Sequence, residues 1–209
     1  MQARLGRWLG MAPGWSAAIS VIALVLALLF VWGFRPTEVQ PPPSLRTDPA
    51  PFGIVSLQVA GSAENANEIL ESWQGSRLEN ARRSTFLDWF PFIPIYVVVL
   101  LLGVASGSAA FVRRGSPRRA AVGLLLGWAV VAAGVLDATE NFFLLCMIDA
   151  RMAGYAVPGP ACPLGSALFA WPKIGIMGMA IVYLGVTVVA WPWRGTYSLP
   201  APGSRTSSK

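Results

Sequence analysis

The chain has 209 residues, of which 55% are hydrophobic and only 12% are charged, with a net charge of +6. That charged share is about half of the share in a typical globular protein, and the mean hydropathy is high at +0.56, so the composition indicates an integral membrane protein. Histidine is absent and there are two cysteines, which excludes Ser-His-Asp and Cys-His nucleophiles, histidine zinc sites, bis-histidine haem and a single-chain iron–sulfur cluster.

Four long apolar runs predict an all-α fold, a four-helix transmembrane bundle, because each run can cross a hydrocarbon core of about 30 Å. We expect these spans at residues 16–34, 89–112, 120–148 and 173–193. The first run ends without the small residues of a cleavage site, so we interpret it as an uncleaved signal anchor. In the second run, Pro91 and Pro94 should kink the helix or delay its start.

The positions of the basic residues predict the orientation of the spans. The short segment 113–119 holds four arginines and no acidic residue, which predicts a cytoplasmic turn. Both termini, residues 1–15 and a disordered tail at 194–209, are then cytoplasmic, and the loops 35–88 and 149–172 lie on the opposite side. Because the basic residues stand at the ends of apolar runs, and not in a patch with exposed aromatic residues, we expect no nucleic-acid partner.

The first outer loop is expected to hold a proline-rich linker followed by a small strand–helix–helix element. Apolar and polar residues alternate over residues 55–59, which predicts a short strand. Ser62 is a candidate N-cap for a helix that runs to about Trp73, and Gly75 separates this helix from a second one that leads into the membrane. Elements this small do not bury a core alone. The apolar stripe around Trp73 should therefore dock on the bundle or the membrane surface, or alternatively bind a partner.

Two stretches of this sequence resemble a family of small bacterial four-span membrane proteins. The first stretch contains Ala60-Gly61-Ser62-Ala63-Glu64, Glu68-Ile69-Leu70-x-x-Trp73, Ala81-Arg82-Arg83-Ser84-x-x-Leu87-Asp88 and Tyr96. The second stretch is Leu136-Asp137-Ala138-Thr139-Glu140-Asn141. The resemblance implies a location in the bacterial cytoplasmic membrane, but it implies no particular activity.

The third predicted span carries a group of polar residues on one helix face. Asp137, Glu140 and Asn141 stand at positions i, i+3 and i+4, so they are neighbours on that face. Gly134 and the close-packing pair Gly123 and Gly127 share the same side, which turns the carboxylates into the bundle. The second span offers a similar face and runs antiparallel beside the third; it contains Gly103, Gly107 and Tyr96.

The acidic residues should therefore converge toward the outer side of the membrane. Adjoining segments bring the other members of this expected cluster, which are Asp88, Arg82, Arg83 and Lys173. In one interpretation the cluster is a structural network that fixes helix register, because an unpaired buried carboxylate costs about 2.5 kcal/mol or more. In the other, Asp88, Asp137 and Glu140 bind a proton, an ion or a small substrate in a transport-related role.

The remaining signals are weaker. No nucleophile or second-substrate motif supports catalysis, and we expect no cofactor and no resident metal. The expected partners are the lipid bilayer and either another membrane protein or a second copy of the chain. Cys146 and Cys162 should both lie at or beyond the outer face, where oxidation is permitted. A disulfide bridge between them and an unbridged Cys146 facing the membrane both stay open.

Overall fold

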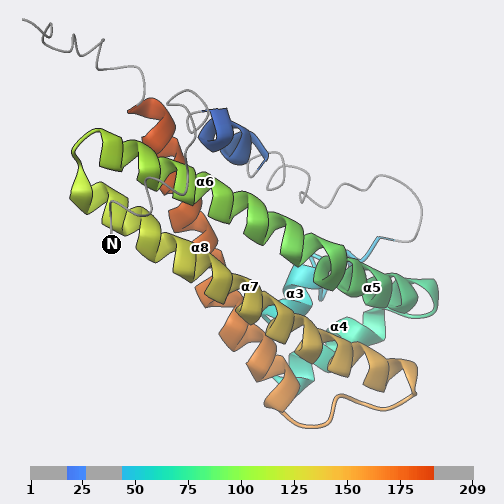
Figure 1. Ribbon diagram of the computed structural model, residues 1–209. Helices are drawn as coiled ribbons and strands as arrows, with labels where there is room; N and C mark the ends of the chain where they lie inside the picture. Colours follow the sequence, from blue (N-terminus) through green and yellow to red (C-terminus); the bar gives the residue numbers. More distant parts are fainter. Residues whose placement is uncertain (1–17, 27–43, 191–209) are drawn as a thin grey trace, which may run out of the picture.

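The computed structural model describes residues 18–26 and 44–190, and these residues are mainly helical (Figure 1). The predictions for residues 1–15, 194–209 and most of the first span and linker lie outside the described residues, although residues 18–26 are helical. The labelled elements are α3 (Ile54–Gln58), α4 (Ala63–Ser72), α5 (Ser76–Leu87), η1 (Asp88–Phe92), α6 (Ile93–Arg113), α7 (Pro117–Met152) and α8 (Ala161–Val189).

Three of the described helices are long and apolar enough to cross a membrane. They are the continuous stretch Ser76–Arg113, which joins α5, η1 and α6, and the helices α7 and α8. These three correspond to the second, third and fourth predicted spans. The all-helical class and the membrane character therefore agree with the sequence, while the first span is only partly described.

The proline-containing start of α6 is irregular, as Pro91 and Pro94 predict. Phe90 has φ −149° and ψ 115°, which is outside the helical region, and it separates α5 from α6 within η1. Pro91 follows at once, and Pro94 stands in the first turn of α6, where its missing N–H leaves no hydrogen bond unmade. The chain therefore changes direction here, at the point where Asp88 enters the bundle.

Helix α8 begins at Ala161, well before the predicted residue 173, and so removes much of the predicted loop 149–172. The predicted span followed the last long uncharged run, which begins after Lys173, and Pro172 just before it usually interrupts a helix. Pro172 is nevertheless inside α8, and proline is tolerated in membrane helices where packing compensates for the lost bond. Ser166, Ala170 and Lys173, at helical spacing, are all buried and hold this part of α8 in place.

The predicted strand at residues 55–59 is wrong, because this segment lies in the short helix α3. Ser56 and Leu57 are its buried residues, and Ser56 Oγ accepts a hydrogen bond of 3.0 Å from the Phe52 amide. The amide of Val59 donates to the carbonyl of Val55 at 3.2 Å. A strand needs a neighbouring strand for these groups, whereas a helical turn satisfies them locally. Alternation over five residues was too short to distinguish the two.

The two predicted helices of the same element are present and dock on the bundle. Ser62 caps α4 by accepting a hydrogen bond of 3.2 Å from the amide of Asn65. Trp73, just after α4, is fully buried in a core that it shares with Leu144 and Ile148 of α7. Figure 1 shows α3, α4 and α5 at one end of the bundle and the α6–α7 connection at the other. Of the alternatives for the Trp73 stripe, the bundle is the surface that it contacts.

The glycines of α6 make room for α8. A Cβ atom added to Gly103 would lie 2.6 Å from Ala23 Cβ, in the helical residues 18–26, and 3.0 Å from Leu184 Cδ2 of α8. One added to Gly107 would lie 2.9 Å from Thr187 Oγ1, also of α8. The Gly103 and Gly107 pattern thus marks a close contact, as expected, but its partners are α8 and, at Gly103, also Ala23, and not the glycine pair of α7.

The glycines of α7 face two different helices. Gly123 lies against the phenol ring of Tyr183 in α8, whereas Gly127 and Gly134 face α6. A Cβ on Gly134 would lie 2.6 Å from Val97 Cγ2, and one on Gly127 would lie 3.4 Å from Leu101 Cδ1. Only the first of these two distances is too short for an ordinary contact.

This difference predicts unequal effects of two matched substitutions. Gly134→Ala should lower the free energy of unfolding by about 1–3 kcal/mol, because the added Cβ overpacks the contact with Val97, whose branched side chain has little freedom to turn away. Gly127 lies on the same helix and faces the same neighbouring helix, α6, but its contact is an ordinary one. Gly127→Ala should therefore leave the free energy of unfolding unchanged or raise it. Unfolding in detergent, followed by circular dichroism, measures both. Equal stability of the two variants would contradict this account of the α6–α7 contact.

A buried polar network between three helices

Helices α6, α7 and α8 each contribute a polar side chain to one buried contact. Lys173 Nζ of α8 lies 2.5 Å from Asp137 Oδ1 and 2.7 Å from Glu140 Oε2, both of α7. From α6, Tyr96 donates its phenolic hydrogen to Asp137 Oδ2 at 2.8 Å. Asp137 is therefore held from two sides, and a single aspartate links all three helices.

Asn141 extends this network toward the kink before α6. Its Nδ2 donates a hydrogen bond of 2.6 Å to Asp88 Oδ2. Asp88 also interacts electrostatically with Asp137 and Lys173, so the two parts form one cluster. The structure thus brings together six of the eight residues expected to converge; they are Asp88, Tyr96, Asp137, Glu140, Asn141 and Lys173. We call this set the polar network.

The two expected arginines do not join the polar network. Arg82 Nε pairs with Asp149 Oδ1 at 2.7 Å, in a surface contact where the two side chains are 43% and 50% exposed. Its guanidinium also lies over the ring of Phe86. Arg83 is exposed. Arg82 of α5 therefore contacts α7 at Asp149. In the sequence, Asp149 is marked only by its position just after the third apolar run. Exposed ion pairs of this kind stabilise by about 0–1 kcal/mol.

Apart from Asp88, which is half-buried, the polar network is almost completely shielded. The exposed fractions are 4% for Asp137, 0% for Glu140, 1% for Asn141 and 8% for Lys173. Among the described residues, Glu140 Oε1 has no hydrogen-bond partner. Removing ionised groups from water costs several kcal/mol for each ion unless other charges and hydrogen bonds compensate for it. The network therefore has to be judged by how completely its charges and oxygens are paired.

The charges of the polar network do not balance. Three carboxyl groups, those of Asp88, Asp137 and Glu140, face one ammonium group, that of Lys173, so the formal charge is −2 when all four are ionised. Lys173 contacts two of the three carboxylates, and Asp88 has an amide partner in Asn141. A neutral network requires additional positive charge.

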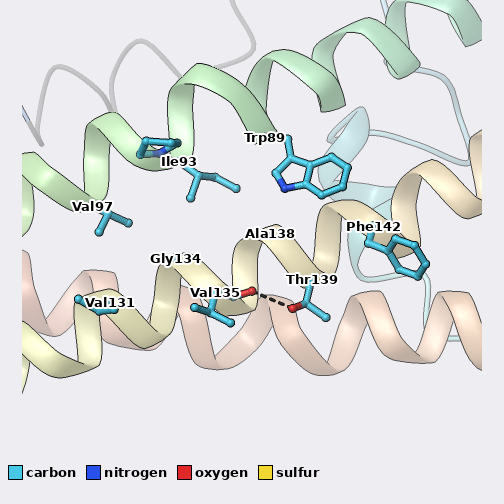
Figure 2. Close-up of a pocket in the computed structure, with 10 residues that line it drawn as sticks. Trp89, Ile93, Val97, Val131, Gly134, Val135, Ala138, Thr139 and Phe142 are labelled. Atoms are coloured by element: carbon cyan, nitrogen blue, oxygen red, sulfur yellow. Dashed lines mark hydrogen bonds between the residues drawn. The ribbon is translucent and has the colours of Figure 1, made fainter.

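An apolar groove of about 540 Å³ opens between α6 and α7 near the polar network (Figure 2). Figure 2 shows Trp89, Ile93 and Val97 along one side of the groove and residues of α7 along the other. The hydroxyl of Thr139 donates to the carbonyl of Val135 at 2.8 Å, within α7. No carboxylate of the network lines this groove or a second pocket at the α6–α7 turn. The groove thus presents hydrocarbon, and a substrate lying in it would not touch the network.

The two cysteines lie close enough for their thiols to interact, although the structure describes both as free. Cys146 is exposed on α7 and Cys162 is half-buried in the first turn of α8. A bridge between them stays a prediction. Within residues 18–26 and 44–190, no group of three or more Cys, Asp and Glu side chains is arranged to hold a metal ion.

Comparison with known proteins adds no further assignment. No protein-family model, no curated protein and no solved structure matches the chain. The resemblance to the small bacterial membrane proteins stays an expectation, and function has to be argued from the polar network itself.

Proposed function

We propose that this chain is a non-catalytic, multi-pass membrane protein whose polar network takes up protons, in a transport-related role. The observation that carries the proposal is the charge imbalance, in which two buried carboxyl groups and the half-buried one of Asp88 share one ammonium group while Glu140 Oε1 has no partner among the described residues. A network that only fixed helix register should pair its charges and satisfy its oxygens. Ionisable residues inside a membrane are, in general, the positions where protons and ions bind.

A proton fits this site better than a larger ligand does. Apart from Asp88, the network is shielded, and it lines neither of the two pockets described above, so neither pocket places a substrate beside the carboxylates. Metal ions require several ligands around one point, and the described residues offer no such group. A proton needs only one carboxyl oxygen, and the unpaired Oε1 of Glu140 is such an oxygen.

The competing function is structural, and one observation favours it. Asp137 contacts both Tyr96 and Lys173, so its carboxylate joins α6, α7 and α8 and would set their register without binding anything. The two readings differ in what the third carboxyl group does. In a structural network it is neutralised once during folding, whereas in a binding site it exchanges its proton in the folded protein.

Infrared spectroscopy of the full chain in lipid nanodiscs tests the proposal. A protonated carboxyl group absorbs separately from a carboxylate, and we expect its band near neutral pH, with reversible changes as pH is varied and loss of intensity in Glu140→Gln. Asp149→Asn is the matched control, since Asp149 is exposed and paired with Arg82. Absence of the band from the wild-type protein overturns the proposal. Stabilisation by sodium but not by choline, lost in Asp137→Asn, would identify a cation site instead.

We also propose that both termini are cytoplasmic and that the protein resides in the bacterial cytoplasmic membrane. The segment 113–119, which includes the α6–α7 turn, carries four arginines and no acidic residue, and the α3–α5 element at the other end of the bundle carries four of the ten acidic residues. Cysteine labelling checks this orientation with Ser116→Cys in the turn and Glu64→Cys in α4, made in a chain whose two native cysteines are serine. A membrane-impermeant reagent should label only the second position in intact cells.

A further inference from the structure

A second pocket lies at the end of the bundle opposite the α3–α5 element, where the α6–α7 turn meets the end of α8. Its volume is about 870 Å³. One part of its wall is basic and consists of Arg114, Arg118 and Arg119. Another part is apolar and comes from α8, with Val182, Gly185, Val186, Val189 and Ala190. We call it the arginine pocket.

The helices that form the arginine pocket carry no acidic residue near it in the sequence. The sequence has no acidic residue between Trp89 and Leu136, and none after Asp149. The start of α7 adds positive potential, because its first backbone hydrogen bond runs from the Ala120 amide to the Ser116 carbonyl and the preceding N–H groups point out of the helix end. An anion bound here would therefore meet no acidic side chain from α6, from the first half of α7 or from α8.

Two of the three arginines, Arg114 and Arg119, are held by contacts, whereas Arg118 is exposed. Arg114 Nη1 donates a hydrogen bond of 2.8 Å to the Ala190 carbonyl, which ties the turn to the end of α8. The Arg119 guanidinium lies 5.7 Å from the ring centre of Phe111. Tyr183 of α8 donates to the Arg119 carbonyl at 3.2 Å. Three helices therefore fix the basic wall of the pocket.

The apolar wall shows what kind of anion fits. Val182, Val186 and Val189 stand at helical spacing on one face of α8, with exposed fractions of 66%, 48% and 67%. Helix α8 is one of the helices long and apolar enough to span a membrane. The pocket thus places guanidinium groups beside a hydrocarbon surface. A soluble phosphate matches only the guanidinium groups. A phospholipid with a net negative headgroup matches both the guanidinium groups and the hydrocarbon surface.

We propose that the arginine pocket binds an anionic phospholipid, with its phosphate against Arg118 and Arg119 and an acyl chain along Val182 and Val186 of α8. Basic residues at a membrane surface each contribute about 1 kcal/mol to binding an anionic lipid, which corresponds to about fivefold in affinity. The site is separate from the polar network, so it stands or falls independently of the proposed function.

Lipid exchange, measured by native mass spectrometry of the full chain in detergent, tests this inference. The wild type should bind phosphatidylglycerol more tightly than phosphatidylcholine, and the double variant Arg118→Gln, Arg119→Gln should lose about 30-fold in affinity for phosphatidylglycerol alone. Arg83→Gln is the matched control, an exposed arginine at the opposite end of the bundle. Equal affinity of the wild type for both lipids overturns the inference. The inference is also overturned if glycerol phosphate competes for the site as strongly as phosphatidylglycerol does.

A second pair of variants tests the apolar wall without changing charge. A Cβ on Gly185 would have no neighbour within 4 Å and Gly185 lines the pocket, so we expect the side chain of Gly185→Phe to extend into it. Gly178→Phe is the control on the same helix, because Gly178 has equally open space but does not line the pocket. Phosphatidylglycerol binding should weaken in the first variant only. Equal binding by both variants would show that the acyl chain does not lie along α8.

Discussion

Replacing Lys173 with methionine is expected to lower the free energy of unfolding by about 3–5 kcal/mol. Methionine preserves the length and the packing of the side chain but removes the ammonium that lies 2.5 Å from Asp137 and 2.7 Å from Glu140. Both carboxylates are buried. Breaking a buried ion pair from one side leaves an uncompensated charge, and this effect exceeds that of removing the whole pair. Chemical unfolding in detergent, followed by circular dichroism, measures the loss.

Compensating changes separate lost charge from lost packing. The triple variant Lys173→Met, Asp137→Asn, Glu140→Gln carries no ionisable group at these positions, and we expect it to recover most of the stability that the single variant loses. Arg82→Met is the surface control, because its pair with Asp149 is exposed and should contribute at most about 1 kcal/mol. A loss in Lys173→Met no larger than that in Arg82→Met would show that Lys173 does not neutralise the network.

The helical part of this network was predictable because its determinants are local. The spacing of Asp137, Glu140 and Asn141 follows from the period of a helix, whatever surrounds it. The short turn at 113–119 then makes α6 and α7 antiparallel neighbours, which brings Tyr96 to the depth of Asp137. Neither step requires knowledge of distant packing, so both can be argued from sequence.

What the sequence did not reveal depends on contacts between distant segments. The start of α8 was misplaced because the predicted span followed the last long uncharged run, which begins after Lys173, whereas the helix extends back to Ala161 through the buried residues Ser166 and Ala170. The partner of Gly103 was misassigned for a similar reason, since a small-residue pattern indicates a close contact but not which helix makes it. The charge imbalance of the polar network became visible only when Arg82 was located on Asp149.

Trp73 gives the second large expected effect, in the element outside the bundle. Trp73→Ala should lower the free energy of unfolding of the α3–α5 element by about 3–5 kcal/mol, because the indole is fully buried and its removal leaves a large cavity. Its Nε1 also donates a hydrogen bond of 2.8 Å to the Leu45 carbonyl. Limited proteolysis between residues 44 and 88, compared with unfolding of α6–α8, reports where the loss occurs.

Two controls determine why Trp73 matters. Trp73→Phe fills most of the space but loses the bond to Leu45, which is only half-buried, so it should cost about 0.5–1.5 kcal/mol, the usual net contribution of a hydrogen bond. Trp128→Ala removes an indole that is 72% exposed on α7 and should change stability little. Met147 and Ile148 of α7 belong to the same core as Trp73. If Trp73→Ala frees the element without weakening α7, the bundle folds independently and the element docks on it; if α7 loses its last turns as well, the two share one folding unit.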